Sequence, residues 1–383
     1  EKTNYGTLYT PEYKEQYLSG VTYEITARED IVTPEGTVWF NKGDVVDTFT
    51  TGDGITTSSL LQLGKYTIKE TATQTGYVLD PSSYDFDIEY AGQMIDVVEI
   101  KQAYVNERQK LNLDINKTFE EEDKDAYKDV VFGVYSKNDI TLDDEVLIPA
   151  DGLVGILTLD KNGKNNEQLD LPVGDYYVKE LETNVAYKLD EENHDFTFSY
   201  DEDTTKPAVP VSIDLYNEKR RLELEVNKVD KEHYDHFLNG AIFEVYDKTM
   251  GEFVAKLCSG NLMITGNDKD EEYEISKDED FEKVIKTVKT DENKQILLDL
   301  DDGTYYSRKV GDDKVSKHII KDGKAILADA IYGHEYEFKE IKAPTSYQLA
   351  DKSKTYKVEA DKETDTVIYC FENERIIVPN TGV

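Results

Sequence analysis

Apolar and polar residues alternate along short stretches of this chain, and turns rich in Gly, Asp and Asn separate these stretches. A period of two is typical of β-strands, whose successive side chains point to opposite faces of a sheet. No long stretch has the 3.6-residue period of an amphipathic helix. The segment FEKVIKTVK (281–289) fits either one helix or one alternating strand. The pattern therefore predicts an all-β fold.

One alternating stretch occurs three times. It reads YTIKETATQTGYVL at 66–79, YYVKELETNVAYKL at 176–189 and YEFKEIKAPTSYQL at 336–349. In each copy a Tyr, an apolar residue and a Glu hold alternate positions, so Glu70, Glu180 and Glu340 share a face with large apolar side chains. Burying a carboxylate is unfavourable unless it is neutral or paired. Three copies of this arrangement point to a purpose for the Glu.

An Asn followed by Glu closes each copy of the pattern, at Asn106, Asn217 and Asn373. Apolar residues precede each Asn at alternate positions, within residues 100–106, 211–217 and 367–373. We therefore expect each Asn to end a strand and to point toward the core.

In the second and third copies, a Lys lies near the start of the repeat, on the apolar face of an alternating strand. Lys117 ends the alternating stretch LNLDINK, and Lys228 ends LELEVNK. For the first copy, Lys2 in EKT matches NKT at 116–118, and Lys14 is the alternative. A Lys at the end of an apolar strand face is as unusual as the Glu.

Internal repetition divides the chain into three predicted domains, 1–107, 108–219 and 220–375, followed by a tail at 376–383. The third domain contains an insertion at about 258–330, which is either a structured elaboration or a binding surface. Within it, DGTYYSRKV (302–310) resembles VGDYYVKEL (173–181), but Lys309 stands where Glu180 lies, so we assign it no chemistry.

Composition excludes several classes of protein. The 383 residues include 44 Lys plus Arg and 81 Asp plus Glu, for a net charge of −37, which disfavours binding to nucleic acid or anionic membranes. The two cysteines, Cys258 and Cys370, are too few for a disulfide framework; we expect two buried or half-buried thiols, with one bridge as the alternative. The sequence contains no apolar stretch that could span a membrane, and its start at Glu1 without a signal peptide suggests a trimmed fragment.

Lys, Glu and Asn on one core face can react with one another. Burial favours the neutral amine of Lys, which can attack the carboxamide of Asn while a protonated Glu polarises the carbonyl and transfers protons. Ammonia leaves, and an amide joins the two side chains. The reaction occurs once in each domain, so the protein is not an enzyme with turnover, and it needs no cofactor or metal. A buried salt bridge with a hydrogen-bonded Asn is the simpler alternative, but the threefold repetition favours the cross-link.

The repeats resemble the Cna B-type domains, also called SpaA-like or prealbumin-like domains, of Gram-positive surface proteins. The resemblance rests on YTIKE, YYVKE and YEFKEIKAPTSY, on the Lys strands and on the closing Asn-Glu strands. The first two copies lack the Pro found at Pro344. The resemblance implies three tandem β-sandwiches of inverse immunoglobulin-like topology with intramolecular isopeptide bonds. The implied triads are Lys117–Glu180–Asn217, Lys228–Glu340–Asn373 and Lys2–Glu70–Asn106.

The last residues contain VPNTG, which resembles a sortase sorting motif of the LPxTG type. The motif comprises Val378, Pro379, Asn380, Thr381 and Gly382. The resemblance implies cleavage after Thr381 and its linkage by sortase to peptidoglycan or to another pilin, on the cell wall of a Gram-positive bacterium.

Together these features favour a structural role, as the stalk of a sortase-anchored adhesin or an anchor-type pilin. A polymerising backbone pilin is one alternative, although the chain lacks a YPK-type pilin motif. Domains that bind an unknown host ligand are another. A carbohydrate-active enzyme is disfavoured, because the surplus carboxylates lie in charge runs such as EEEDKD that are typical of solvated faces.

Overall fold

The computed structural model describes residues 1–165 and 167–377, and every regular element within them is a β-strand. This confirms the all-β prediction, and within the ambiguous segment 281–289 it shows a strand over Val284–Lys289 and no helix. The chain forms two compact units. The first comprises Glu1–Thr118, Glu122–Asn184 and Leu189–Tyr216, and the second comprises Phe119–Glu121, Val185–Lys188 and the chain from Asn217 onward.

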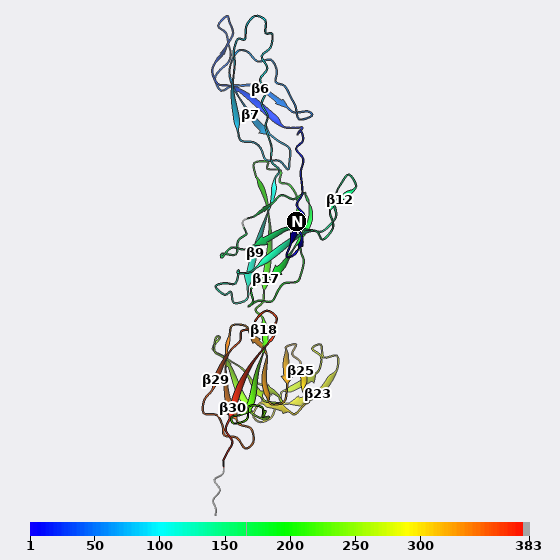
Figure 1. The fold of residues 1–383 in the computed structure, drawn as a ribbon, viewed down its shortest axis with the longest axis vertical. Helices are drawn as coiled ribbons and strands as arrows, with labels where there is room; N and C mark the ends of the chain where they lie inside the picture. The colour runs from blue at the N-terminus through cyan, green and yellow to red at the C-terminus, as the bar shows by residue number, and fades with distance from the viewer. Residues whose placement is uncertain (166, 378–383) are drawn as a thin grey trace, which may run out of the picture. The chain divides into compact units, whose positions relative to one another are not determined.

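In the first unit, the first repeat forms an antiparallel four-stranded sheet (Figure 1). Across the sheet, the strands are β6 (Val45–Thr50), β3 (Thr22–Ala27), β7 (Gly64–Ala72) and β8 (Ser83–Ile88). A hairpin of β4 (Ile31–Val32) and β5 (Val38–Phe40) connects β3 to β6. Ile25, Ile31 and Tyr66 form a small core on one face of this sheet.

The second repeat has the same four-stranded sheet and a second sheet. The four-stranded sheet contains β13 (Leu153–Thr158), β10 (Val131–Ser136), β15 (Gly174–Glu182) and β16 (His194–Phe198) in that order. The other sheet contains β14 (Gln168–Leu169), β9 (Lys110–Phe119) and β17 (Ala208–Asn217), and β11 (Ile140–Leu142) pairs with β12 (Glu145–Ile148). Leu111, Leu113 and Ile115 are buried along β9, as the alternation predicts.

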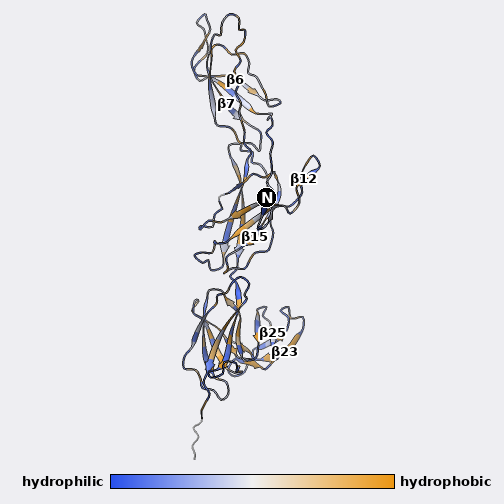
Figure 2. Ribbon diagram, viewed as in Figure 1, coloured by the Kyte–Doolittle hydropathy of each residue, from blue (hydrophilic) through white to orange (hydrophobic). Residues whose placement is uncertain are grey.

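The third repeat, in the second unit, is a two-sheet sandwich. One sheet contains β20 (Glu252–Cys258), β19 (Ile242–Asp247), β28 (Glu335–Lys342) and β29 (Lys354–Lys357), and the other contains β27 (Lys324–Ile331), β18 (Arg221–Asp230) and β30 (Thr366–Asn373). β18 runs parallel to β30. Both sheets contribute to one core, including Leu224 and Phe371 from one and Phe243 and Phe338 from the other. Figure 2 shows hydrophobic residues lying along these strands.

The insertion in the third repeat is a structured elaboration, and it contains a four-stranded sheet like those of the repeats. A four-stranded sheet contains β23 (Val284–Lys289), β22 (Glu272–Ser276), β25 (Gly303–Lys309) and β26 (Val315–Ile320), and β21 (Leu262–Thr265) pairs with β24 (Gln295–Leu298). The strand order matches the other four-stranded sheets. Tyr305 also donates to the carbonyl four residues earlier, at 2.9 Å, as Tyr66 and Tyr176 do at 2.7 and 2.6 Å. Lys309, at the position of the repeated Glu, pairs with Glu271 at 2.6 Å.

The structure corrects two expectations for the first repeat. No strand lies between Ile88 and Lys110 in this fully described stretch, so the strand expected at 100–106 is absent. The N-terminal segment, with the short strands β1 (Lys2–Thr3) and β2 (Gly6–Thr7), contacts the second repeat instead of the first (Figure 1). Tyr9 N–H donates to the Leu153 carbonyl at 2.8 Å, and the Arg108 guanidinium lies 3.1 Å from the centre of the Tyr13 ring.

Cys258 is buried and Cys370 is exposed, and both are free thiols, so the expected burial holds for only one of them. Within the described ranges, no helix has the length and hydropathy needed to cross a bilayer.

Candidate functional site

The core of the third repeat brings together the three residues that the sequence predicts there. Lys228 comes from β18, Glu340 from β28 and Asn373 from β30, and their exposed fractions are 0%, 4% and 3%. Lys228 Nζ lies 3.5 Å from Glu340 Oε1 and donates to Asn373 Oδ1 and, at 3.1 Å, to the Phe371 carbonyl. Asn373 Nδ2 donates to Glu340 Oε2 at 2.8 Å. The parallel pairing of β18 with β30 positions the amine beside the carboxamide.

Burial sets the charge of the amine. Removal from water lowers the pKa of Lys228 to about 8, although the charge and hydrogen bond of Glu340 oppose this shift. A sizeable share of Lys228 is then neutral near physiological pH, which is the nucleophilic form. The ring of Phe371, 4.9 Å from Nζ, forms part of the apolar wall around the amine.

The second repeat pairs its Lys and Glu in the same way. Lys117 Nζ on β9 lies 2.9 Å from Glu180 Oε1 on β15, and both residues are buried. Burial lowers the pKa of Lys117, and Glu180 only partly offsets this effect. Asn217 is 2% exposed at the end of β17, which neighbours β9 in the sheet.

The first repeat contains the Glu and the Asn but not the predicted Lys. Asn106 Nδ2 donates to Glu70 Oε1 at 2.7 Å and to the Val78 carbonyl at 2.9 Å, and Glu70 is 4% exposed. Lys2 is exposed on β1 and Lys14 is exposed in the segment that follows, so neither joins this pair. The reason is that contacts with the second repeat, described above, hold the N-terminal segment.

Sequence reasoning missed a backbone partner of each Glu. The N–H groups of Asp80, Asp190 and Ala350 donate to Glu70, Glu180 and Glu340 at 3.3, 2.9 and 2.9 Å. Each donor lies ten residues after its Glu, and this constant spacing is the signal that could have revealed it. This hydrogen bond holds each Glu carboxyl in place within its repeat.

The repeated Tyr, seven residues after the Glu, also gains a role. In the third repeat Tyr347 donates to Asp230 at 2.8 Å, and Arg375 Nε donates to the same carboxylate oxygen at 2.5 Å. Burial alone would raise the pKa of Asp230, but these hydrogen bonds outweigh it and lower the pKa. The cluster ties the end of β18 to the residues just after β30, next to the Lys–Asn pair.

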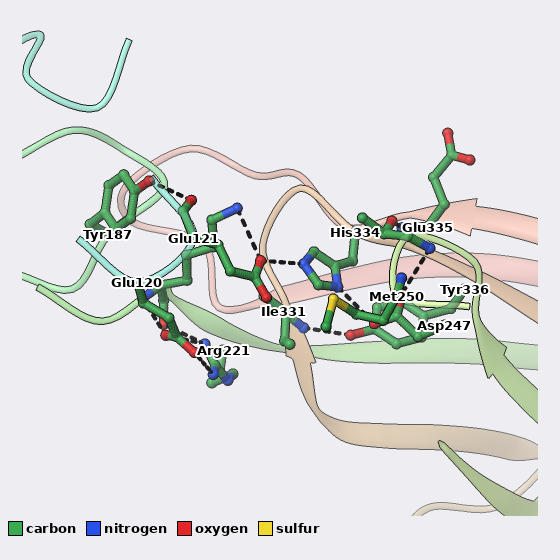
Figure 3. Close-up of polar contacts among 12 residues, drawn as sticks. Glu120, Glu121, Tyr187, Arg221, Asp247, Met250, Ile331, His334, Glu335 and Tyr336 are labelled. Carbon is green, nitrogen blue, oxygen red and sulfur yellow. Dashed lines mark hydrogen bonds and ion pairs between the residues drawn. The ribbon is translucent and has the colours of Figure 1, made fainter. Parts of the chain in front are cut away.

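A second polar cluster lies in the same unit around His334 (Figure 3). The ring is 1% exposed, and its two nitrogens lie 2.7 Å from carboxylate oxygens of Glu121 and Asp247. Arg221 forms two hydrogen bonds with the adjacent Glu120, at 3.1 and 2.7 Å. The cluster holds the Glu120–Glu121 segment against the third repeat, so we assign it a structural role.

The sortase-like motif at 378–382 lies outside the described residues, whereas Ile376 and Ile377 just before it are exposed.

The three repeats match one known domain family. The sequence profile of the SpaA family, described as a prealbumin-like fold domain, matches residues 10–103, 112–210 and 308–374. No curated protein matches the chain.

Among solved structures, 71 chains match. The Bacillus anthracis TIE protein is 19% identical with a TM-score of 0.38; the match covers 96% of this chain and 50% of that protein, so this chain spans half its length. A streptococcal ancillary pilin is 16% identical with a TM-score of 0.25, covering 94% of this chain and 93% of the pilin. The shaft pilin SpaA of Lactobacillus rhamnosus GG is 16% identical with a TM-score of 0.21, covering 71% and 99%.

The three profile matches take in more than half of the residues, and each includes the repeated Glu of one of the repeats described above. The chain therefore belongs to the SpaA family of prealbumin-like fold domains.

Proposed function

We propose that this chain is a structural segment of a Gram-positive surface protein, a stalk or pilin whose second and third repeats are each closed by a Lys–Asn isopeptide bond. The observation that carries the proposal is the buried triad of the third repeat, in which a Lys with a lowered pKa touches a carboxamide that a buried carboxyl also binds. Lys117–Glu180–Asn217 is the corresponding triad in the second repeat.

The proposed reaction balances without any added reagent. Lys228 Nζ attacks Asn373 Cγ, an amide N–C bond forms, the bond from Cγ to Nδ2 breaks, and ammonia leaves. Glu340 transfers a proton from the attacking amine to the departing nitrogen and is regenerated. The bond would restrict the unfolded chain as a disulfide does, in a protein with only two cysteines.

Intact mass tests the proposal directly. We expect the purified chain to be lighter than its sequence mass by two molecules of ammonia, about 17 Da each. Tryptic mapping should join Lys117 to Asn217 and Lys228 to Asn373. An intact mass equal to the sequence mass would refute the cross-links.

Attachment to the cell wall through Thr381 is the second part of this proposal, and it rests on the VPNTG sequence and the family. Incubation with a class A sortase and a triglycine nucleophile should replace Gly382-Val383 by triglycine on Thr381. A Thr381→Ala variant is the matched control. Equal labelling of both proteins would refute the motif.

One observation favours ligand binding as a second candidate function. Trp39, the only Trp in the chain, is 54% exposed and lines a shallow groove with Phe40, Val46, Leu60 and Leu61. Exposed apolar surface of this kind is found at binding sites. A Trp39→Ala variant that binds a glycan array as the wild type does would exclude this groove as a carbohydrate-binding surface.

A further inference from the structure

We propose that Tyr347 and Asp230 are positioning residues for the reaction of the third repeat. They hold the end of the Lys strand β18 against the end of the Asn strand β30, so that the Lys228 amine stays beside the Asn373 carboxamide. The inference rests on the isopeptide chemistry of the proposed function. It assigns the alignment of the two strands to residues outside the triad.

The reacting residues lie at the end of the pairing between these two strands. Lys228 is opposite Phe371, and Asn373 is opposite Asp230 in the last pair of the parallel register. The ends of a paired strand open more readily than its middle. The reaction, however, needs the amine and the carboxamide carbon to stay within about 3–3.5 Å of each other. A contact beyond the last pair would therefore keep the two groups in place.

Tyr347 makes such a contact with the Lys strand. Its hydroxyl donates to Asp230 Oδ2 at 2.8 Å, and Asp230 is 1% exposed. The other carboxylate oxygen, Oδ1, accepts from the Glu232 N–H at 2.8 Å, so hydrogen bonds hold both oxygens of Asp230. Asp230 comes two residues after Lys228, and alternate side chains share a face of the strand. Holding Asp230 therefore restrains the direction in which Lys228 points.

The backbone around Tyr347 is also bonded to the end of the Asn strand. Tyr347 forms an antiparallel bridge with Arg375, and two backbone hydrogen bonds of 2.9 Å flank it. The carbonyl of the next residue, Gln348, accepts from Asn373 Nδ2 at 2.7 Å. Nδ2 is the nitrogen that leaves in the proposed reaction. The Tyr347 segment thus orients the carboxamide, with Oδ1 turned toward Lys228.

The same bridge occurs in all three repeats. In each, the Tyr seven residues after the Glu pairs with the residue two positions after the Asn: Tyr77 with Arg108, Tyr187 with Lys219 and Tyr347 with Arg375. Two backbone hydrogen bonds of 2.8–2.9 Å flank the bridge each time. The repeated Tyr therefore has a fixed place beside the repeated Asn.

The second repeat links its Tyr to its Lys strand with a different pair of side chains. Phe119, the last residue of β9, comes two residues after Lys117, as Asp230 comes two after Lys228. The Phe119 ring packs against Tyr187 with 4.5 Å between the ring centres, and both residues are buried. An aromatic contact in one repeat and a hydrogen bond to a carboxylate in the other join the same two positions. The link is kept while its chemistry changes, as expected of a contact whose role is alignment.

The rate of bond formation tests this role. The intact chain is made by cell-free synthesis, quenched with acid at set times and digested, and the cross-linked peptide of each repeat is quantified by mass. Tyr347→Phe, which removes only the hydroxyl, and Asp230→Ala should each slow the bond of the third repeat by about 10- to 100-fold, since a misplacement of about 1 Å is enough for such a loss. The bond of the second repeat, in the same molecules, should form at the wild-type rate.

Two further comparisons separate positioning from folding. Trypsin resistance of the third repeat, measured in the same samples, should appear as fast in both variants as in the wild type. Asp230→Phe, which copies the aromatic pair of the second repeat, should form the bond faster than Asp230→Ala. Tyr369→Phe is the matched control with the wild-type rate, because the Tyr369 hydroxyl donates to the Lys357 carbonyl, at 2.6 Å, and not to the Lys strand.

The possible results distinguish three cases. A wild-type rate of bond formation in both Tyr347→Phe and Asp230→Ala would overturn the inference. Bond formation that slows only in step with trypsin resistance would also overturn it, because the two residues would then serve folding alone. Failure of the proposed function is seen separately, since the wild type itself would then lose no ammonia in either repeat.

Discussion

At the scale of single residues, the site depends on burying groups that water would normally keep charged. Lys228 is fully buried, yet its partners are one carboxyl, one carboxamide oxygen and one carbonyl. In water the ammonium form would dominate, whereas burial lowers the pKa of Lys228 to about 8. The apolar strand face therefore favours the neutral amine that the proposed reaction needs, and this amine lies beside both Glu340 and Asn373.

The first prediction concerns the Glu. Replacing Glu340 by Ala should abolish the proposed Lys228–Asn373 bond and leave the proposed Lys117–Asn217 bond intact, because in the proposed reaction Glu340 transfers protons without being consumed. The third repeat should fold but lose stability, by roughly the 4–5 kcal/mol that closing a loop of more than 100 residues provides. Intact mass gives the number of bonds, and thermal unfolding gives the stability. Glu337→Ala on the same strand is the matched control, and a persisting Lys228–Asn373 peptide in the Glu340 variant would disprove the role of Glu340.

The residue-scale predictions succeeded where alternation alone decides which way a side chain points. Lys117, Lys228, Glu180 and Glu340 lie on strand faces whose other members are apolar, so their burial follows from local sequence. Lys2 could not be predicted in this way, because whether residues 1–17 pair with the first or the second repeat depends on long-range contacts.

At the scale of elements, four sheets in the described residues share the same order of four strands. Sequence repetition revealed only three of these sheets. The fourth, in the insertion, lacks the Lys–Glu–Asn signature and carries Lys309 where the others carry Glu. The sequence DGTYY was the one local sign of this fourth sheet. Gly303 and Tyr305 hold the same positions in it as Gly174 and Tyr176 hold in the sheet of the second repeat. Conversely, residues 100–106 have a strand pattern but form no strand, because pattern alone does not supply a pairing partner.

The insertion also carries the second prediction, which is a dependence on pH. Burial lowers the pKa of His318 on β26 from 6.5 to about 4, and its ring shares a 2.8 Å hydrogen bond with Ser307 on β25. Between these two pH values the unfolded chain binds the proton and the folded chain does not. Stability is therefore full above about pH 6.5 and falls as the pH drops toward 4.

The loss in the free energy of unfolding has an upper limit of about 3 kcal/mol, and the partial exposure of the His318 ring makes it smaller. Hydrogen-exchange protection of β25 and β26, measured from pH 7 to 4.5, should show this decrease. His318→Gln should flatten the profile, whereas the same change at the exposed His233 should not. Protection that rises on acidification would contradict the prediction.

At the scale of the whole molecule, the third prediction is that the repeats act as spacers with little extension under load. The Lys strand opens each closed repeat and the Asn strand ends it, so force applied to the ends of the third repeat enters at β18 and leaves at β30. The proposed bond between Lys228 and Asn373 would carry this force directly. Residues 229–372, including the inserted sandwich, would then be shielded from load.

Single-molecule pulling on the intact chain measures this shielding. Unfolding of the third repeat should release almost no length in the wild type. In an Asn373→Ala variant the same repeat should release an additional length of about 500 Å, because some 140 residues become extensible at 3.3–3.6 Å each. Asn261→Ala, in the insertion, is the matched control, because it removes a carboxamide from the shielded residues and leaves the triad intact. Full extension of the wild-type repeat would show that the load does not pass through this bond, whereas shielding lost only in the Asn373 variant would tie the mechanical role of the molecule to one buried amide.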